Sequence, residues 1–214
     1  VEQAHALGMR VIITDHHLTT KPTPPAEAVV NPNQLGCDFP SKALAGVGVA
    51  FYLLANLSSH RSKFNKSFAK MTQYLDLVAL GTYADVASLD FNNRILVDAG
   101  VKRIQSSQCR SGILALLDIA GRDPKDLKAQ DLGFVIGPRV NAAGRMDTMN
   151  IGIECLLAED MQTAYAFARQ LNELNLERRS VETEMKQEAL SVIDQLEFNQ
   201  DQLPSALIMF EEHW

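Results

Sequence analysis

Short apolar runs of strand length alternate with longer segments of helical spacing along most of the chain. Residues 10–14 and 28–30 have the continuous, β-branched apolar character of strands. Residues 74–81 fit either a helix or a strand. Helices are expected at residues 44–57, 92–104 and 112–120. This alternation predicts an α/β fold with a mainly parallel sheet, in which the strand at 10–14 is buried on both faces.

Two further segments stand out from this alternation. Residues 133–145 contain three Gly and a Pro, which favours a structured loop. Residues 161–196 keep helical spacing without Gly or Pro, and such a helix is roughly 50 Å long. Its length and charge indicate a connector between domains, with a coiled-coil arm as the alternative. The chain begins inside a helical pattern at 1–9 and ends on an apolar run at 206–210, so we expect a piece of a longer protein.

The composition excludes several classes of protein. With 214 residues, 46% hydrophobic and 21% charged, the chain is an ordinary globular sequence. Cys37, Cys109 and Cys155 lie far apart, which argues against a disulfide scaffold and favours a reducing, cytoplasmic setting. No apolar window reaches the length of a membrane span, so no membrane partner is expected.

The net charge of −6 first argues against a nucleic-acid partner, but the charge is unevenly distributed. Residues 94–145 carry nine basic and five acidic side chains, whereas residues 146–214 carry four and fourteen. The basic block ends in the Gly-rich segment, and the acidic excess lies mainly on the long helix. The total charge therefore does not exclude nucleic acid.

The sharpest candidate site is Asp15-His16-His17, directly after the first strand. Sites in open α/β sheets form at the carboxyl ends of strands. Imidazole together with carboxylate suits Mn²⁺, and Mg²⁺ is tolerated where carboxylates dominate. A chance pair of surface histidines explains the bare tripeptide about equally well, but its place after Val11-Ile12-Ile13-Thr14 favours a site.

Two other segments supply matching chemistry. Asp85 follows an apolar segment, where a carboxylate is costly unless it is paired or binds a cation. A helix cap is the alternative. In the Gly-rich segment, Arg139, Asn141 and Arg145 combine guanidinium groups with accessible backbone N–H groups, which are typical of phosphate binding. A tight turn with solvated arginines is the alternative there.

Taken together, these motifs resemble the DHH phosphoesterase superfamily, in its branch of exonucleases specific for single-stranded DNA. The matching segments are T-D-H-H at 14–17, N-P-N at 31–33, L-D-L-V-A-L-G-T-Y-A-D-V at 75–86 and G-P-R-V-N-A-A-G-R at 137–145. The resemblance covers essentially the whole chain, and the last motif is specific to that branch. It implies a metal-dependent hydrolase that degrades single-stranded DNA from 5′ to 3′ in DNA repair and recombination.

The resemblance also implies roles for single residues. His16 and Asp85 match metal ligands of a two-metal site for Mn²⁺ or Mg²⁺. His17 matches the residue that contacts the scissile phosphate, and Asp15 the carboxylate that orients the histidines. Arg139, Asn141 and Arg145 match the segment that holds the DNA backbone. The implied roles are catalytic (Asp15, His16, His17, Asp85), metal-binding (His16, Asp85) and DNA- or phosphate-binding (His17, Arg139, Asn141, Arg145).

The implied organisation has three parts. Residues 1–150 match a DHH phosphoesterase domain without its amino-terminal strands, residues 151–200 a connecting helix, and residues 201–214 the start of a truncated DHHA1-type domain whose first strand is 206–210. In the family, aspartates that supply much of the metal site lie on strands before the DHH motif, and the resemblance implies that this chain begins after them. We therefore expect these 214 residues to be inactive by themselves.

Two other functions remain open from the sequence. One is a DHH phosphoesterase that acts on short oligonucleotides, cyclic dinucleotides or pyrophosphate, and the other is a non-catalytic scaffold with a DHH core. The Gly-Pro-Arg segment and the long helix argue against the first, and intact His16, His17 and Asp85 argue against the second. For the complete protein the resemblance implies single-stranded DNA, a single-strand-binding protein and a helicase as partners, and we expect a monomer.

Overall fold

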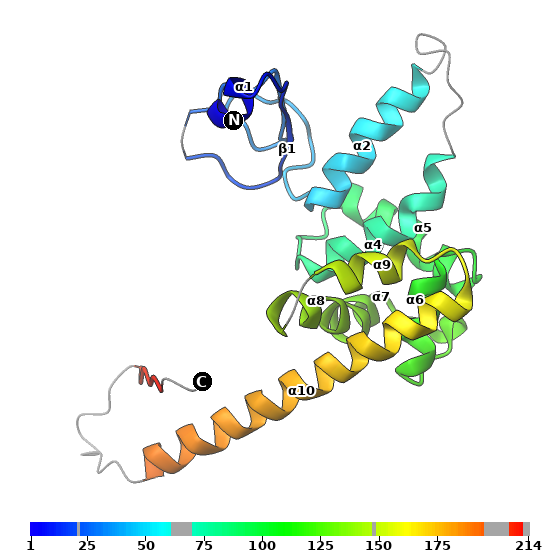
Figure 1. The fold of residues 1–214 in the computed structure, drawn as a ribbon. Helices are drawn as coiled ribbons and strands as arrows, with labels where there is room; N and C mark the ends of the chain where they lie inside the picture. Colours follow the sequence, from blue (N-terminus) through cyan, green and yellow to red (C-terminus); the bar gives the residue numbers. More distant parts are fainter. Residues whose placement is uncertain (21, 61–69, 147–148, 195–205, 212–214) are drawn as a thin grey trace.

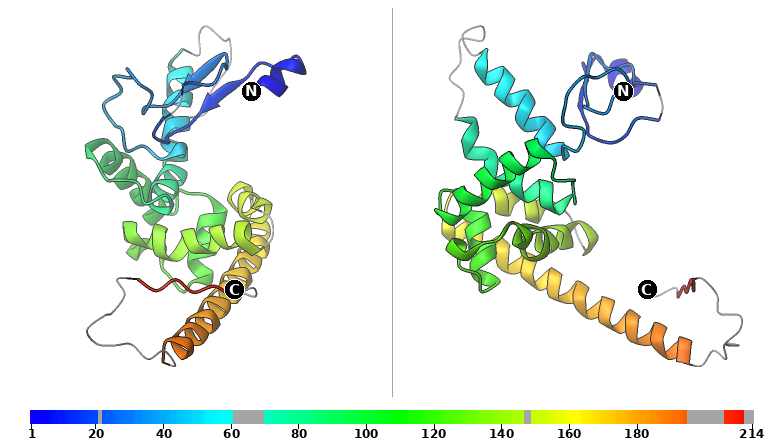
Figure 2. Two further views of the ribbon diagram at one scale, coloured as in Figure 1. Left: turned by 90° about the vertical axis from the view of Figure 1, so that its left-hand side faces the viewer. Right: turned by 180° about the vertical axis from the view of Figure 1, so that it is seen from behind.

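A small lobe at the N-terminal end joins a larger helical body, from which one long helix extends (Figures 1 and 2). The computed structural model describes residues 1–20, 22–60, 70–146, 149–194 and 206–211, without the side chains of 145 and 146. The lobe contains α1 (Glu2–Ala6), β1 (Ile12–Thr14) and β2 (Ala28–Val30).

The two strands of the lobe pair in parallel, with Ile13 opposite Val29. Within the described residues the sheet has only these two strands, so β1 has a single neighbour. Ile12 and Thr14 are consequently exposed, Ile12 by 67%. The prediction of parallel strands is confirmed, but the prediction that β1 is buried on both faces is wrong: α2 contacts β1, whereas the face that carries Ile12 and Thr14 is exposed.

The body consists of helices that pack directly on one another. They are α2 (Gly46–Ser59), η1 (Met71–Tyr74), α4 (Leu75–Ala84), α5 (Phe91–Gln105), α6 (Ser111–Ile119), η2 (Pro124–Asp126), α7 (Ala129–Asp131) and α9 (Asn150–Leu157). The ambiguous segment 74–81 lies in the helix α4, whose buried residues include 75, 78, 79 and 82 in helical spacing. The described chain is thus mostly helical, with a small parallel sheet at one end.

Residues 132–146 are helical, and the prediction of a loop over 133–145 is wrong. A π-helical turn, η3 (Leu132–Ile136), runs directly into α8 (Gly137–Met146). A proline inside an α-helix lacks one N–H and clashes with the carbonyl four residues earlier. Pro138 avoids this cost because the wider turn ends just before it and places it in the first turn of α8. Leu132 and Ile136 are fully buried, so tertiary packing stabilises a helix that the composition disfavours.

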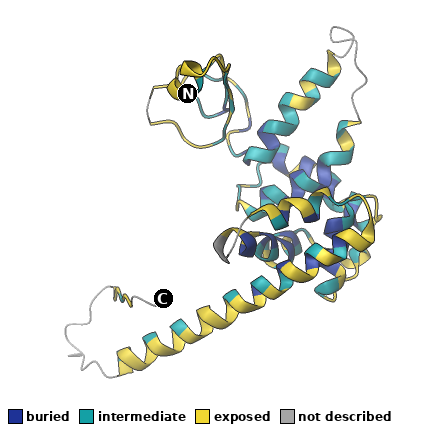
Figure 3. Ribbon diagram, viewed as in Figure 1, coloured by how far each residue is buried: buried dark blue, intermediate teal, exposed yellow. Residues whose placement is uncertain are grey.

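The predicted long helix is confirmed as α10 (Met161–Asp194), whose 34 residues span about 51 Å. Its first half packs against α6, α8 and α9, and its second half extends into solvent (Figure 3). The expected helical residues 195–196 lie outside the described residues. No helix of the described ranges has the length and hydropathy that a membrane span requires.

The expected strand at 206–210 is not formed: residues 206–211 are described without regular secondary structure. A strand needs a partner for its backbone N–H and C=O groups. In this chain Ile208 and Phe210 are 95% and 81% exposed, so nothing packs on their side chains. The division into a DHH domain, a connector and a DHHA1-type domain stays a prediction.

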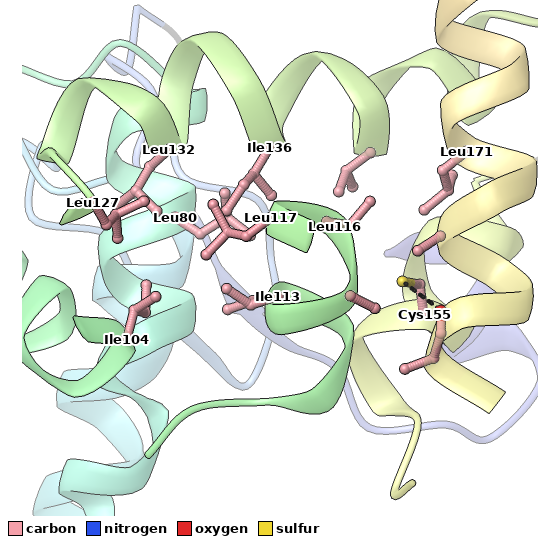
Figure 4. Close-up of a cluster of buried hydrophobic side chains, with 14 of the residues drawn as sticks. Leu80, Ile104, Ile113, Leu116, Leu117, Leu127, Leu132, Ile136, Cys155 and Leu171 are labelled. Carbon is pink, nitrogen blue, oxygen red and sulfur yellow. Dashed lines mark hydrogen bonds between the residues drawn. The ribbon is translucent and has the colours of Figure 1, made fainter. Parts of the chain in front are cut away.

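The main hydrophobic core lies among α6, η3, α8 and α10 (Figure 4). Its largest fully buried apolar side chains are Ile104, Ile113, Leu116, Leu117, Leu132, Ile136 and Leu171. A second cluster, which includes Leu44, Val49 and Val78, joins α2 to α4, and Val30 of β2 packs against it. Burial of each such apolar side chain contributes about 1.5–3 kcal/mol to the free energy of folding. The second cluster therefore attaches the sheet to the helical body.

Polar contacts reinforce the attachment of the lobe. The Ser41 hydroxyl donates to Asp90 Oδ2 at 2.6 Å, and the same carboxylate accepts the N–H of Asn93 as the N-cap of α5. The buried Asn93 amide donates to the carbonyl oxygens of Ala43 and Ser88, each at 2.8 Å. The loop before α2 is therefore tied to the start of α5, close to the point where α4 ends.

Cys109 and Cys155 should resist thiol reagents in the folded chain. Burial raises the pKa of Cys109 to about 12 and that of Cys155 to about 11. Only the thiolate reacts, so at pH 8 about one molecule in a thousand or fewer is reactive at either position. Iodoacetamide labelling followed by mass spectrometry should show both residues protected until urea unfolds the chain. Equal labelling rates in the folded and unfolded states would contradict this burial.

The same shifts set a pH dependence of stability. Both thiols have folded pKa values above their ordinary value of 9.0. Their contribution to stability is complete below pH 9 and declines between about pH 9 and pH 12, because the unfolded thiols ionise first.

Candidate metal and nucleic-acid site

Asp15, His16 and His17 follow β1 directly and begin the loop at the carboxyl end of the sheet. The Asp15 backbone N–H donates to the Val30 carbonyl at 3.0 Å, so the parallel pairing continues one step past β1. The tripeptide thus leaves the strand at a defined point. This is the position in parallel α/β sheets at which ligands bind.

The Asp15 carboxylate organises both histidines. Its Oδ1 atom accepts the backbone N–H groups of His16 at 2.7 Å and His17 at 3.2 Å. The same atom lies 2.7 Å from the His17 Nδ1. The hydrogen bond with the His17 side chain, helped by the backbone donors, holds the pKa of Asp15 below its ordinary value of 3.8. The His17 side chain is 78% exposed, so Asp15 orients a ring that is open to solvent.

Two asparagines after β2 secure the histidine backbone. The Asn31 amide donates to the His17 carbonyl at 2.9 Å, and the Asn33 amide donates to the His16 carbonyl at 2.6 Å. Asn31 Oδ1 in turn accepts the Asn33 N–H at 2.8 Å. Neither asparagine was predicted to have a role at the site. Their signal was the Asn-Pro-Asn motif directly after the neighbouring parallel strand.

His16 faces a carboxylate that is 69 residues away in sequence. His16 Nδ1 lies 3.5 Å from Asp85 Oδ2, with the two side chains 23% and 44% exposed. Gly46, the first residue of α2, lies against the Cδ2 side of the His16 ring. A Cβ at this position would be 3.5 Å from His16 Cδ2. The start of α2 and the end of α4 therefore position the His16 ring between them.

The His16–Asp85 pair fits a divalent metal ion as two of its ligands. Two donors bound to one ion at about 2.1 Å lie about 3 to 3.5 Å apart, which agrees with the observed separation. A nitrogen with a carboxylate oxygen is a donor set that Mn²⁺ accepts. In the described part of the chain, no third His, Cys, Asp or Glu joins them to complete a cluster.

Asp85 is the C-cap residue of α4, at the end where the helix dipole is negative. A carboxylate there is electrostatically unfavourable unless a positive charge lies close by. Its place at a helix cap was one alternative drawn from the sequence, and the structure shows that the cap and the contact with His16 occur together.

Val86, the next residue, has a left-handed backbone with φ of 53°. Its N–H donates to the Tyr83 carbonyl, and the Ala87 N–H donates to the Thr82 carbonyl, which together form a Schellman turn. The left-handed region costs about 1–2 kcal/mol for a residue with a Cβ, and more for a β-branched one. The Val86 side chain is 89% exposed.

The Gly-rich segment contributes only part of the expected phosphate-binding surface. Arg139 is half-buried in α8, where its Nη1 donates to the Val135 carbonyl at 2.7 Å and its Nε to Asn172 Oδ1 at 3.1 Å. Burial, and secondly the charge of Arg179, lower the pKa of Arg139. These contacts brace α8 against η3 and α10. The Asn141 side chain is exposed, and the Arg145 side chain lies outside the described residues.

A cavity of about 210 Å³ lies beside the end of α4, between α8 and α10. Its lining residues are Ala84, Gly133, Gly137, Pro138, Asn141, Ala142 and Arg178. Arg178 also forms an ion pair with Glu182. Arg178 was not predicted as a site residue, because the long helix was interpreted as an acidic connector. Its signal was the Arg178-Arg179 pair, the only adjacent arginines in the sequence.

The structure therefore divides the predicted site residues into groups. Asp15 contacts His17, and His16 contacts Asp85. Both pairs lie around the carboxyl end of β1. The structure places Asn141 and Arg139 on α8, where Asn141 lines the cavity next to Ala84 and Arg139 contacts Val135 and Asn172. Which of these residues bind metal or DNA stays a prediction.

Comparisons with known proteins find a family match for the first 82 residues and curated relatives for the whole chain. Residues 1–82 match the DHH family, N-terminal domain. The chain is 50% identical to the single-stranded-DNA-specific exonuclease RecJ of Dickeya dadantii and 48% identical to that of Escherichia coli, in each case over 100% of this chain. It spans 38% of the length of either relative.

Two solved structures of RecJ proteins share the fold of this chain. A crystal structure of exonuclease RecJ bound to manganese matches with a TM-score of 0.77 and 36% identity, over 89% of this chain and 47% of that one. RecJ from Thermus thermophilus in complex with Mg²⁺ matches with a TM-score of 0.70 and 35% identity, over 85% of this chain and 26% of that one. Half of the residues are identical to those of a RecJ protein, and the fold agrees with two RecJ structures. The chain is therefore similar over its whole length to a segment of RecJ proteins, and its first 82 residues match the DHH family, N-terminal domain.

Proposed function

We infer that this chain is part of a metal-dependent exonuclease that hydrolyses phosphodiester bonds of single-stranded DNA from the 5′ end. The observation that carries this function is the approach of His16 Nδ1 to Asp85 Oδ2 at 3.5 Å, at the carboxyl end of a parallel strand. The RecJ relatives are named as single-stranded-DNA-specific exonucleases, and RecJ structures hold Mn²⁺ or Mg²⁺.

His16 and Asp85 are proposed to hold one divalent ion. When bound, the ion supplies a water of lowered pKa and positive charge against the phosphate. His17 points its exposed ring to solvent, where it is proposed to contact a non-bridging oxygen of the scissile phosphate. Asp15 keeps that ring in place through the 2.7 Å contact with Nδ1, which leaves Nε2 to face the substrate.

The DNA backbone is proposed to run past the cavity beside Ala84. Asn141 and Arg178 offer an amide and a guanidinium at its wall, and these groups bind phosphate oxygens well. Arg139 supports this surface by fastening α8 to η3 and α10, and it is proposed to contact the DNA backbone as well. Arg145, near the end of the same helix, is proposed to extend the contact.

The 214 residues alone are proposed to hydrolyse DNA poorly. His16 and Asp85 are two ligands, and the described residues add no third one to a cluster. The complete protein is proposed to act as a monomer in the cytoplasm during repair and recombination, on strands that a helicase opens and a single-strand-binding protein covers.

A nuclease assay tests the function. We expect the full-length protein to degrade 5′-labelled single-stranded DNA in Mn²⁺, and EDTA to abolish the reaction. Under the same conditions the 214-residue chain should be at least 100-fold slower, on the order of the loss that follows removal of one catalytic group. Duplex DNA of the same sequence is the control. Preference for dinucleotides or pyrophosphate over long strands would contradict the proposal, and so would equal rates for the chain and the full-length protein.

A further inference from the structure

Within the described residues, four helices end in the same two-bond turn, so their left-handed residues can be compared directly. After α1, α5, α6 and α4 these residues are Gly8, Ser107, Gly121 and Val86, with φ of 74°, 56°, 68° and 53°. In each turn the left-handed residue donates its N–H to the carbonyl three residues back, and the next residue donates to the carbonyl five residues back. The backbone requirement is therefore the same at all four positions.

Val86 is the residue that fits this requirement least. Glycine has no Cβ and adopts the left-handed region at no steric cost, whereas a β-branched side chain is a marked outlier there. Packing does not offset the cost, because the Val86 side chain is 89% exposed. Places where a residue breaks a local rule without a compensating contact in the fold are concentrated at functional sites.

The position of Val86 indicates what its side chain contacts. It follows Asp85 directly, so the two Cα atoms are about 3.8 Å apart, and Asp85 faces His16. Because Val86 adjoins Asp85, a nucleotide whose phosphate is held at the His16–Asp85 pair would place its deoxyribose or base near this side chain. Both groups offer apolar faces, which an isopropyl group contacts favourably.

We propose that Val86 is a substrate-contacting residue that packs against the sugar or base of the nucleotide at the cleaved end. This inference rests on the proposed function. The Schellman turn then has two effects: it ends α4 so that Asp85 faces His16, and it presents an apolar side chain beside that carboxylate. Val86 thus increases binding of a nucleotide end at the expense of stability of the turn.

The experiment compares four variants of the full-length protein. Val86→Gly and Val86→Asn relieve the left-handed backbone and remove the apolar group, whereas Val86→Ile keeps both. Ser107→Gly relieves the equivalent turn after α5, at a residue that has no place in the site. Thermal unfolding reports on the turn, and steady-state hydrolysis of single-stranded DNA in Mn²⁺ reports KM and kcat.

Ser107→Gly should raise Tm by about 2–3 °C, and Val86→Gly should raise it by more, because a β-branched residue has the larger cost in the left-handed region. Val86→Gly and Val86→Asn should also raise KM about tenfold, with kcat within about twofold of the wild type. Ser107→Gly and Val86→Ile should leave KM unchanged. A residue with a purely structural role would not give this combination of a higher Tm and a higher KM.

Other results overturn the inference. If the wild type hydrolyses single-stranded DNA but Val86→Gly and Val86→Asn keep its KM, Val86 does not contact substrate while the proposed function stands. If Val86→Gly lowers Tm, Val86 packs against another part of the full-length protein. If the wild type has no Mn²⁺-dependent hydrolysis, the proposed function fails and this inference fails with it.

Discussion

Asp85→Asn should lower Mn²⁺-dependent hydrolysis of single-stranded DNA by the full-length protein on the order of 1000-fold. Asparagine keeps the shape of the side chain but removes the charge that we propose to bind the ion. The side chain is 44% exposed and ends a helix, so the folded state loses little, and Tm should change by less than about 2 °C. Activity and thermal unfolding of the same preparation check both parts.

The same variant makes the proposed pairing with His16 testable. If both side chains hold one ion, the double variant Asp85→Asn, His16→Ala should be no slower than the slower single variant. Asp98→Asn, on the surface of α5, is the control and should keep full activity. Mn²⁺ paramagnetic resonance should show weakened binding in each site variant. Full activity of Asp85→Asn, or strictly multiplicative losses in the double variant, would contradict a shared ion.

Asp76→Asn should be the most destabilising single substitution that we consider. Asp76 is fully buried in the first turn of α4, and its carboxylate accepts the Arg110 backbone N–H at 2.9 Å and the Arg110 Nη1 at 2.9 Å. The Arg110 guanidinium also lies 5.1 Å from the Tyr74 ring centroid. Removal of one partner from a buried ion pair costs about 3–5 kcal/mol, which corresponds to a fall in Tm of roughly 10 °C.

The matched control for Asp76 is an exposed ion pair of the same body. Asp98 accepts from Lys102 at 2.7 Å, with the two side chains 62% and 70% exposed. Asp98→Asn should change stability by less than about 1 kcal/mol, because solvent screens that pair. Circular dichroism melts of Asp76→Asn and Asp98→Asn measure the two changes in Tm. Similar falls in Tm would show that the Asp76–Arg110 pair gains nothing from its burial.

The sequence singled out residues that the structure brings close together, although it was wrong about several elements around them; the roles of these residues stay predictions. The tripeptide Asp15-His16-His17 was recognised from the strand before it, and Asp85 from the apolar segment before it. Their contact was expected only through family resemblance, since no local pattern relates residues that are 69 positions apart. The contact itself arises because α2 packs on α4 and backs the His16 ring with Gly46.

For the Gly-rich segment, residues 133–145, the prediction from the sequence was wrong. The segment was predicted to be a loop, since Gly and Pro disfavour helices locally. The structure forms a helix there because Leu132 and Ile136 are buried in the core and a π-helical turn accommodates Pro138. Arg139 consequently braces the helix, and Arg178 of α10 reaches the cavity in its stead.

The sequence by itself determined the strand that precedes Asp15-His16-His17, the long helix and the resemblance to the DHH family. These depend on local periodicity and on motifs, which act over a few residues. Only the tertiary structure decided that His16 meets Asp85, that Asp76 is buried with Arg110, that α10 adds a cation to the α8 surface, and that Val86 ends α4 with an exposed side chain. Those features depend on which helices pack together, and that packing is a property of the whole core, beyond any single segment.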